Sequence, residues 1–375
     1  MGWPGAIAAL LTLGTTVRVD VQVAVDAQGE LGPAWLEAIE GRISKDALAR
    51  HRRERRPLSP AELAWLARFR GNLPRWTANA PTLHVPFDDV VPPARVSLVL
   101  GNRGGDDGFT SGERTIGVDL GAWVSAYGDA AAPGSDDRIV RILSHEYTHL
   151  LSRAWAKTHR VFVETPVERA LWTCFHEGLG NYRSLSEKWR TAEGALTTHA
   201  RATLARLEPA FVERMAGLAR AVTSADEERL LDGIDRGRFD QKWGALTVAL
   251  WLAVEARGDH RNLRTWVKAG PAGILVLARR HLSPDRARRL PRVLVGQALD
   301  AKAGAVIETA DAGVVYVAGL PSWPAALRQR RVAVTGIVVT RKLIPDPVVG
   351  PKGEISQGAQ GDQTVIEGAR WRLVE

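Results

Sequence analysis

Two histidines and a glutamate near the middle of the chain have the spacing of a metal-dependent hydrolytic site. The segment from Ser144 to Leu150 reads Ser-His-Glu-Tyr-Thr-His-Leu, which matches the pattern His-Glu-x-x-His. On a helix, residues four positions apart share a face, so both imidazoles can reach one Zn²⁺ ion at about 2.0–2.1 Å. We expect His145 and His149 to bind one zinc ion per chain. Glu146 then stands beside the ion, as a general base for metal-bound water.

The residues around this motif are typical of a buried helix. Ser135 or Asp136 can cap the start of the helix, directly after a Pro-Gly pair. Buried histidines need partners for their ring nitrogens, which favours a metal site over the alternative of two surface histidines on an amphipathic helix. Apolar residues flank the motif on both sides, at Ile142, Leu143, Leu150 and Leu151.

A catalytic zinc ion needs a third protein ligand and one open position. The pattern that supplies a third histidine six residues after the second fails here, because Trp155 occupies that position. A later helix is therefore expected to supply the ligand. Glu168 and Glu177 compete for this role on a helix that starts near Pro166. They are nine residues apart and face opposite directions, so only one of them can face the metal.

Local sequence favours Glu177. The segment from Thr165 to Glu168 forms a capping box with Pro at the first helical position, which gives Glu168 a structural role. A face of small residues would let this helix approach the histidine-bearing helix closely enough for a carboxylate to bind. The predicted ligands are therefore His145, His149 and Glu177. The small neighbours of Glu177 are Ala170, Thr173, Cys174, Gly178 and Asn181.

The other polar residues near Glu177 have more than one interpretation. Asn181 either accepts a hydrogen bond from a ligating histidine or ends the helix beside a glycine. Tyr182 and His176 point away from the Glu177 face, so we expect Tyr182 to be buried and His176 to be exposed. The group that stabilises the oxyanion is left open among these two, His199, His260 and later arginines. Cys174 is expected to be a small buried residue rather than a ligand.

The segment His145-Glu146-Tyr147-Thr148-His149, followed by Glu177-Gly178-Leu179-Gly180-Asn181-Tyr182, resembles the gluzincin metallopeptidases. This family includes the thermolysin-like and aminopeptidase-type enzymes. The second helix in its members often reads Glu-Gly-x-x-x-Tyr or Glu-x-x-x-Asp. Gly178 and Tyr182 match the first pattern, and Asn181 replaces the Asp of the second. The resemblance covers about residues 135–185, and it implies zinc, Glu146 as the base, and hydrolysis of peptide or protein substrates.

Apolar patterning predicts an α+β protein with three regions. Residues 1–134 are expected to form an N-terminal α/β part of the catalytic domain, with edge strands. Residues 135–290 are expected to form a helical, zincin-like metal-binding part, and residues 293–375 a small all-β domain. The predicted strands of the first region are 17–25, 96–100 and 115–120, with a helix from Ser59. The predicted helices are 139–155, 167–182, 204–219 and 243–254.

The C-terminal region changes to short, valine-rich strand candidates at 306–309, 314–318, 332–339 and 364–374. A polar loop from Pro345 to Asp362 interrupts them. The segments that begin at Gly304, Val314, Ser322 and Val332 resemble small OB-like β modules appended to bacterial exported proteins. The resemblance implies a small β-barrel.

The net charge is +8, and basic residues gather in three clusters, Arg50–Arg56, Arg279–Arg292 and Arg328–Arg331. Solvated helix faces and loops explain these clusters better than a nucleic-acid surface, because no nucleic-acid motif accompanies them. The rival function is a non-catalytic binding protein with a vestigial or structural metal. It would engage an anionic polymer or an envelope partner through these clusters and the β module. The oligomeric state is left open.

No apolar run reaches the roughly 18 residues that a transmembrane span requires. The run from Ala6 to Leu13 is either a degenerate export signal or a first strand that continues into 17–25. The single cysteine excludes an intramolecular disulfide. We favour an exported location, periplasmic or extracellular, over the cytoplasm. The glycine-rich loop Gly101–Gly112 lacks the ending of a nucleotide-binding loop and is expected to be a flexible hairpin connection.

Overall fold

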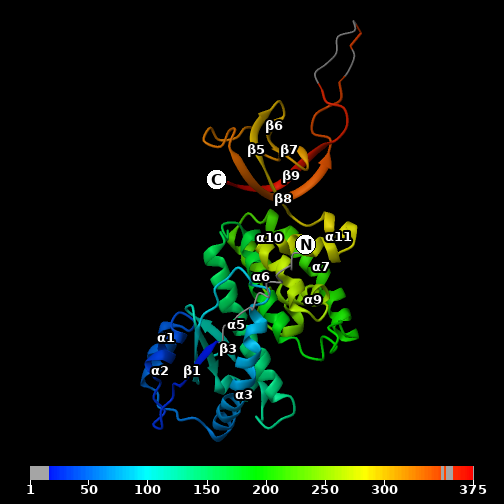
Figure 1. Cartoon of the computed structure of the whole chain (residues 1–375). Coiled ribbons are helices and arrows are strands. Elements are labelled where there is room, and N and C mark those ends of the chain that lie inside the picture. The colour runs from blue at the N-terminus through cyan, green and yellow to red at the C-terminus, as the bar shows by residue number, and fades with distance from the viewer. Residues whose placement is uncertain (1–16, 348–349, 352–357, 375) are drawn as a thin grey trace, which may run out of the picture. The chain divides into compact units, whose positions relative to one another are not determined.

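The computed structural model describes residues 17–347, 350–351 and 358–374 (Figure 1). The apolar run Ala6–Leu13 therefore lies outside the described residues. The chain divides into two compact units, one that ends at His159 and one that begins at Arg160. The predicted α+β class is confirmed, with many helices, one open sheet and one closed barrel at the C-terminus.

The first unit contains a four-stranded sheet with the strand order β1-β2-β4-β3. Strands β1 and β2 pair in parallel, as do β2 and β4, whereas β3 is antiparallel to β4. The elements in chain order are β1 (Arg18–Val23), α1 (Pro33–Ile39), α2 (Lys45–Arg53), α3 (Pro60–His84), β2 (Arg95–Gly101), β3 (Gly108–Ser111), β4 (Thr115–Asp119), α4 (Leu120–Tyr127) and α5 (Ser135–Thr158).

Helices cover both faces of this sheet. On one face, Trp35 of α1 packs on Val99 and Phe109 in a buried apolar cluster. On the other face, Trp65 of α3 packs edge-on against Trp123 of α4, with ring centroids 4.9 Å apart. Tight aromatic packing of this kind contributes beyond the apolar area that it buries. The sheet is therefore a rigid support for α5, which lies on it together with α3.

The start of α3 has the predicted capping box. The Ser59 hydroxyl accepts a hydrogen bond from the backbone N–H of Glu62, and the Glu62 carboxylate accepts one from the N–H of Ser59. Glu62 is buried and also pairs with Arg56 at 2.7 Å. This carboxylate therefore fixes both the first turn of α3 and the chain that enters it.

The second unit begins with a helical part whose centre is α9 (Ala245–Ala256), buried along almost its whole length. Helix α6 (Pro166–Ser184) packs against it so closely that a Cβ atom at Gly178 would stand 2.6 Å from Val248. The remaining helices are α7 (Thr198–Arg220), α8 (Ser224–Leu231), η1 (Phe239–Gln241), η2 (His260–Leu263), α10 (Arg264–His281) and α11 (Pro284–Arg288).

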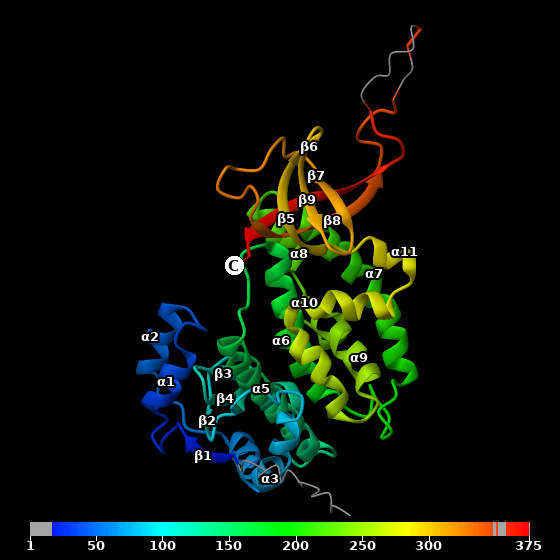
Figure 2. The same ribbon diagram turned by 45° about the horizontal axis from the view of Figure 1, so that its top comes forward.

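A closed barrel with the strand order β5-β6-β7-β9-β8 follows, drawn in yellow to red in Figure 2. All neighbouring pairs are antiparallel except β7 and β9. The buried Trp323 caps the core, and its indole N–H donates to the Val306 carbonyl at 2.7 Å. The strands are β5 (Arg292–Ala301), β6 (Gly304–Thr309), β7 (Gly313–Val317), β8 (Arg331–Arg341) and β9 (Gln363–Leu373).

The barrel packs on the helical part through the end of β9. Arg372 pairs with Glu168 at 3.3 Å, and its guanidinium lies 3.3 Å from the centre of the Phe162 ring. Arg370 donates to the Ala221 carbonyl at 2.6 Å, just beyond α7. These contacts join the barrel and the helices into one compact unit.

The expectation that the loop Gly101–Gly112 is a hairpin connection is wrong. The flanking strands β2 and β4 are parallel, so the segment between them is not a simple hairpin connection. It instead contains β3, a short strand that returns along β4. Asp119 holds the loop, because its carboxylate accepts hydrogen bonds from the backbone N–H groups of Gly104 and Gly105.

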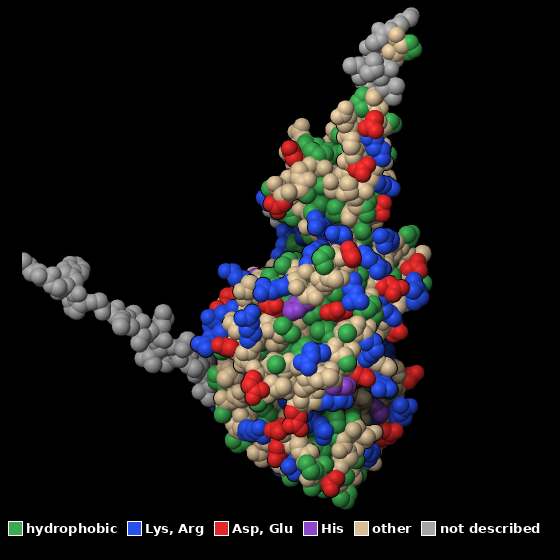
Figure 3. Space-filling view, turned by 90° about the vertical axis from the view of Figure 1, so that its right-hand side faces the viewer, with side chains coloured by type: hydrophobic (Ala, Val, Ile, Leu, Met, Phe, Trp, Pro, Cys, Tyr) green, Lys and Arg blue, Asp and Glu red, His purple; other side chains and the backbone are tan. Residues whose placement is uncertain are grey.

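Several arginines of the basic clusters form ion pairs with neighbouring acids. Lys and Arg side chains are interspersed with Asp and Glu on the face shown in Figure 3. No helix among the described residues is long and apolar enough to cross a membrane. Ion pairs within the clusters are Arg50–Glu54, Arg55–Glu30, Arg56–Glu62, Arg280–Glu255, Arg286–Glu208 and Arg328–Asp300.

Candidate metal centre

The motif lies in the middle of α5, a helix anchored at its start to α3. Neither Ser135 nor Asp136 caps the helix, contrary to expectation. The cap position belongs to Gly134, in the left-handed region at φ 80°, and no side chain caps it. The Asp136 carboxylate instead accepts hydrogen bonds from Arg68 and Asn72 of α3, at 2.6–3.0 Å. An acid in the first turn still favours the helix dipole, and here it also ties two helices together.

The two histidines of the motif meet at their outer nitrogens. His145 Nε2 and His149 Nε2 are 2.9 Å apart, and the rings are nearly perpendicular. Ligands of one tetrahedral zinc ion at about 2.0–2.1 Å would lie about 3.3 Å apart, so the two nitrogens are close to a chelating arrangement. His149 is buried and His145 is half-buried. The residues present therefore fit a metal ion that approaches from one side of α5.

Glu146 stands beside this pair of histidines. Its Oε1 atom lies 4.0 Å from His145 Nε2, and its side chain is only 8% exposed. One ligand atom from each of His145, Glu146 and His149 falls within 4.8 Å of the others. A buried carboxylate at this distance is in reach of a water molecule held near the two nitrogens, as a general base requires.

Strand β3 runs directly past Glu146. A Cβ atom at Gly108 would stand 3.2 Å from Glu146 Oε1 and 3.1 Å from Ile142 Cγ2. Arg153 of α5 binds the other end of the strand, donating to Thr110 Oγ1 at 2.5 Å and to the Gly112 carbonyl at 3.0 Å. The missing side chain at Gly108 thus makes room for the carboxylate.

Asp107 fixes the end of the loop just before β3. Its carbonyl accepts the indole N–H of Trp123 at 2.6 Å, and its carboxylate accepts the hydroxyl of Tyr127. Burial and the Asp107 charge raise the pKa of Tyr127, so the hydroxyl stays protonated and keeps donating. The buried Trp123 and the half-buried Tyr127 of α4 thereby position the strand that faces Glu146.

The opposite side of the motif is packed and ordered. Tyr147 is fully buried, lies edge-on to Trp76 of α3, and hydrogen-bonds through its hydroxyl to His84. Burial raises the pKa of Tyr147. The Thr148 hydroxyl donates to the Ser144 carbonyl at 2.7 Å. These contacts leave the histidine-bearing face of α5 little freedom to rotate.

Glu177 belongs to the second unit, in the second half of α6. Its side chain is half-buried, and the amide of Asn181 donates to its backbone carbonyl at 2.9 Å. Burial raises the pKa of the nearby Asp235, and the Glu177 charge adds to this. Asp235 is a neighbour that sequence reasoning missed, because the loop that carries it has no motif. That Glu177 joins the two histidines stays a prediction.

Two of the small residues around Glu177 pack against the start and the body of α9. We had expected the small-residue face to allow a close approach to the histidine-bearing helix. Gly178 faces Val248, and Cys174 lies against the backbone at Gly244, where α9 begins. Cys174 is buried, as expected, and burial raises the pKa of its thiol. This part of the small-residue face therefore serves the close packing of α6 on α9.

Glu168 has the structural role that its sequence context predicts. It forms the capping box with Thr165, through hydrogen bonds of 3.0 and 3.2 Å. Its second oxygen pairs with Arg372 of the barrel. Both carboxylate oxygens are thus engaged within the second unit, which weighs against Glu168 as a metal ligand.

Two residues considered as oxyanion donors have defined surroundings in the second unit. Tyr182 is buried, as expected, and its hydroxyl lies 2.9 Å from His260 Nδ1. Burial, together with Arg183 and Arg190, lowers the pKa of His260 to about 3, so this ring is neutral at ordinary pH. His176 is half-buried and stacks on Trp172, so the expectation that it is exposed is wrong.

Comparisons with known proteins give no relative for this chain. No family model matches the sequence, and neither the curated proteins nor the solved structures contain a match.

Proposed function

We propose that this protein is a zinc-dependent peptidase of the gluzincin type, with His145, His149 and Glu177 as metal ligands. The observation that carries the proposal is the convergence of two imidazole Nε2 atoms 2.9 Å apart beside the buried Glu146 carboxylate. A purely structural metal site does not need a base next to it. The buried Glu146 therefore favours a hydrolytic site over a structural one.

Zinc, when bound, polarises the scissile carbonyl and lowers the pKa of water toward about 7. Glu146 takes the proton from the attacking water and passes it to the leaving amine. Gly108 leaves space for this carboxylate, and Ile142 packs on the other side of that space. The carboxylate is thereby restricted to the side of α5 on which the two histidine nitrogens meet.

The sheet offers a surface for an extended substrate. Strand β3 stands at the edge of the sheet, and within the described residues it pairs only with β4. A peptide can add to such an edge as a further strand, through hydrogen bonds between main chains. Because β3 passes beside Glu146, a peptide bound along it would present its backbone close to the base. This supports a peptide as the substrate class.

Elimination supports Glu177 as the third ligand. Glu168, the competing carboxylate of α6, is used by the capping box and by Arg372. Glu177 lies nine residues later on the same helix, in the segment that resembles the gluzincin pattern. Its half-buried carboxylate has the chemistry that zinc accepts as a third ligand.

We further propose that the C-terminal barrel is OB-like. Its five strands follow the closed order first, second, third, fifth, fourth, with the third and fifth parallel. This is the strand order of a Greek-key barrel of the OB type. Several arginines of the basic clusters already pair with acids, so the clusters offer less unpaired charge to an anionic polymer, the partner in the rival function.

The decisive experiment measures zinc and hydrolysis on the same preparations. Elemental analysis of wild type is expected to find one zinc per chain, and His149→Ala is expected to lose it. Glu146→Gln is expected to keep the zinc and to lose hydrolysis of denatured casein by at least about 100-fold, because the amide cannot accept the proton. The exposed Glu187→Gln serves as a matched control and should keep both properties.

Two results would refute the proposal. One is an unchanged rate of hydrolysis in Glu146→Gln. The other is a zinc content in His149→Ala equal to that of wild type. Wild-type protein that binds zinc but cleaves neither casein nor any member of a broad peptide library would favour a structural metal site.

A further inference from the structure

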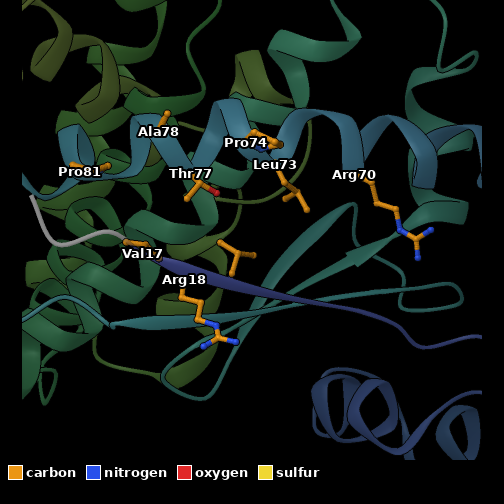
Figure 4. Close-up of a pocket in the computed structure, with 9 residues that line it drawn as sticks. Val17, Arg18, Arg70, Leu73, Pro74, Thr77, Ala78 and Pro81 are labelled. Carbon is orange, nitrogen blue, oxygen red and sulfur yellow. The ribbon is translucent and has the colours of Figure 1, made fainter.

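A groove runs along the first strand of the sheet, between β1 and α3 (Figure 4). It has a volume of about 660 Å³. In the close-up, Leu73 and Thr77 project from α3 toward β1. The residues that line the groove are Val17, Arg18, Val19, Arg70, Leu73, Pro74, Thr77, Ala78 and Pro81.

The floor of the groove is an apolar face of β1 that α3 covers only in part. Val19 lines the groove, and side chains alternate along a strand, so Val21 and Val23 lie on the same face. We call these three residues the edge valines. Val21 is 38% exposed, and the other two are half-buried. The face therefore has apolar surface left for a further element to cover.

The backbone of the edge valines forms an open edge of the sheet. Within the described residues, β1 pairs only with β2. The N–H groups of Arg18 and Ala24 both donate toward β2, at 3.1 and 2.9 Å. Backbone groups alternate in direction along a strand, so residues at even positions bond to β2 and those at odd positions point away from it. The edge valines can therefore bond to another strand through their N–H and C=O groups.

The strand complements a second copy of itself that runs antiparallel. From Val19 to Val23 it reads Val-Asp-Val-Gln-Val. With Val21 opposite its own counterpart, every edge valine faces an edge valine of the other copy. On the other face of the sheet, Asp20 is then opposite Gln22, whose amide can donate to the carboxylate. Opposite charges or a hydrogen bond across two strands stabilise such a pair.

Other registers fit less well. A shift of one residue toward the N-terminus places the two Asp20 carboxylates opposite each other, which is destabilising. A shift of one residue toward the C-terminus places Val19 opposite Val25, which already pairs with Leu31. Each of the other registers brings fewer edge valines opposite one another. The sequence of β1 therefore favours a single way of pairing with itself.

We propose that this protein forms a symmetric dimer in which the β1 strands of two copies pair antiparallel, with Val21 on the twofold axis. A twofold interface uses the same surface on both copies, which is what a self-complementary strand supplies. The two four-stranded sheets then become one continuous sheet. Because the axis is perpendicular to this sheet, both α3 helices lie on the same side of it. The edge valines of the two copies form one apolar strip between these helices.

The mass of the full-length chain in solution tests the proposal without relying on activity. Sedimentation velocity at concentrations up to about 100 μM is expected to show twice the mass of one chain. Val21→Lys should weaken the dimer at least about tenfold, because two ammonium groups would meet at the axis. Val314→Lys is the matched control. It changes a strand valine of the barrel that is 50% exposed, and it should leave the dimer unchanged.

Two changes at Gln22 test the register. Gln22→Lys places an ammonium group opposite Asp20 of the second copy, whereas Gln22→Glu places a carboxylate there. The interface contains this pair twice, so the dissociation constant of the Glu variant should exceed that of the Lys variant by about fivefold or more. Gln22 is exposed, so neither change should disturb the fold. Circular dichroism of all variants checks this.

Hydrogen exchange of the segment 18–24 gives an independent measurement. The amides of the edge valines should become protected as the protein concentration rises into the range of the dimer, because they then donate to the second copy. In Val21→Lys, this concentration dependence should be lost.

Three results would overturn the proposal. In the first, the wild-type chain has the mass of a monomer at every concentration. In the second, Val21→Lys folds and dimerises as tightly as wild type. In the third, Gln22→Lys and Gln22→Glu have equal dissociation constants, which would exclude the register centred on Val21.

Discussion

At the scale of single residues, the sequence indicates local relations well and distant ones poorly. The spacing of His145 and His149 predicts their convergence, because one helical turn brings the two rings together. The capping box of Glu168 is equally local, and it is confirmed. Gly108 could not be identified in this way. Its importance comes from contact with Glu146, and that contact exists only once β3 is placed beside α5.

The competing carboxylates of α6 give a prediction at this scale. Glu177→Ala is expected to weaken zinc binding by more than the roughly 10–100-fold that loss of an outer-shell partner costs. Glu168→Ala is expected to leave zinc affinity unchanged and to lower the free energy of unfolding by about 1–2 kcal/mol, because it removes a cap and the Arg372 pair. Zinc titration and thermal unfolding of both variants check this.

The reverse pattern would be equally informative. If Glu168→Ala loses zinc and Glu177→Ala keeps it, the third ligand has been assigned to the wrong carboxylate, while the two histidines and the base are unaffected.

At the scale of elements, apolar periodicity predicts these helices well, since α5, α6 and α7 include their expected ranges and α9 begins two residues later than expected. The four valine-rich strands of the barrel are also confirmed. Two strands were missed, each for a physical reason. Strand β5 contains Gly296, which lies against the backbone of Glu308, and glycine lowers the strand signal. Strand β3 is only four residues long and sits inside a glycine-rich loop.

The packing of β3 on α5 gives a prediction at the element scale. Gly108→Ala should keep the fold and the zinc content, because only a few tenths of an ångström of adjustment are needed around the new Cβ atom. That adjustment falls on the Glu146 carboxylate. Since small misplacements of a catalytic group are costly, we expect kcat on casein to fall on the order of tenfold.

Gly71→Ala is the matched control, because nothing lies within 4 Å of a Cβ atom there. It sits in the interior of α3, where alanine is the better helix former, so its kcat should equal that of wild type. Equal kcat values for Gly108→Ala and wild type would show that β3 does not position the base.

At the scale of the whole molecule, the parallel pairing of the open sheet could not be predicted from local patterns. Strands β1 and β2 are separated in sequence by α1, α2 and α3, and pairing over such a distance leaves no periodic signal. The β-sheets of the two units also differ in whether they have edge strands. The sheet of the first unit has two edges, whereas the barrel of the second has none.

The stability of the second unit should depend on pH through His260. Its pKa is about 3 in the folded chain, below the ordinary value of 6.5, so between these values the unfolded chain binds the extra proton. The folded state therefore loses stability as pH falls through this window, by on the order of 2 kcal/mol between about pH 7.5 and pH 5. Denaturant unfolding of wild type and His260→Gln at both pH values measures the effect.

Comparison with His260→Gln separates the effect of this one imidazole on stability from the effect of carboxylates that titrate in the same pH range. The stability advantage of wild type over His260→Gln should shrink as the pH is lowered, whereas the exposed His199→Gln should follow wild type. An advantage that stays constant with pH would mean that the folded chain protonates His260 as readily as the unfolded one.

The parallel pairing of β1 with β2 also has a consequence for biosynthesis. The ribosome must add the whole connection from Val23 to Arg95 before β1 can meet its neighbour. At about 5–20 residues per second, this interval lasts roughly 4–14 s. For that time a valine-rich strand is outside the exit tunnel without its partner strand, so the nascent chain is most exposed to wrong associations at its beginning.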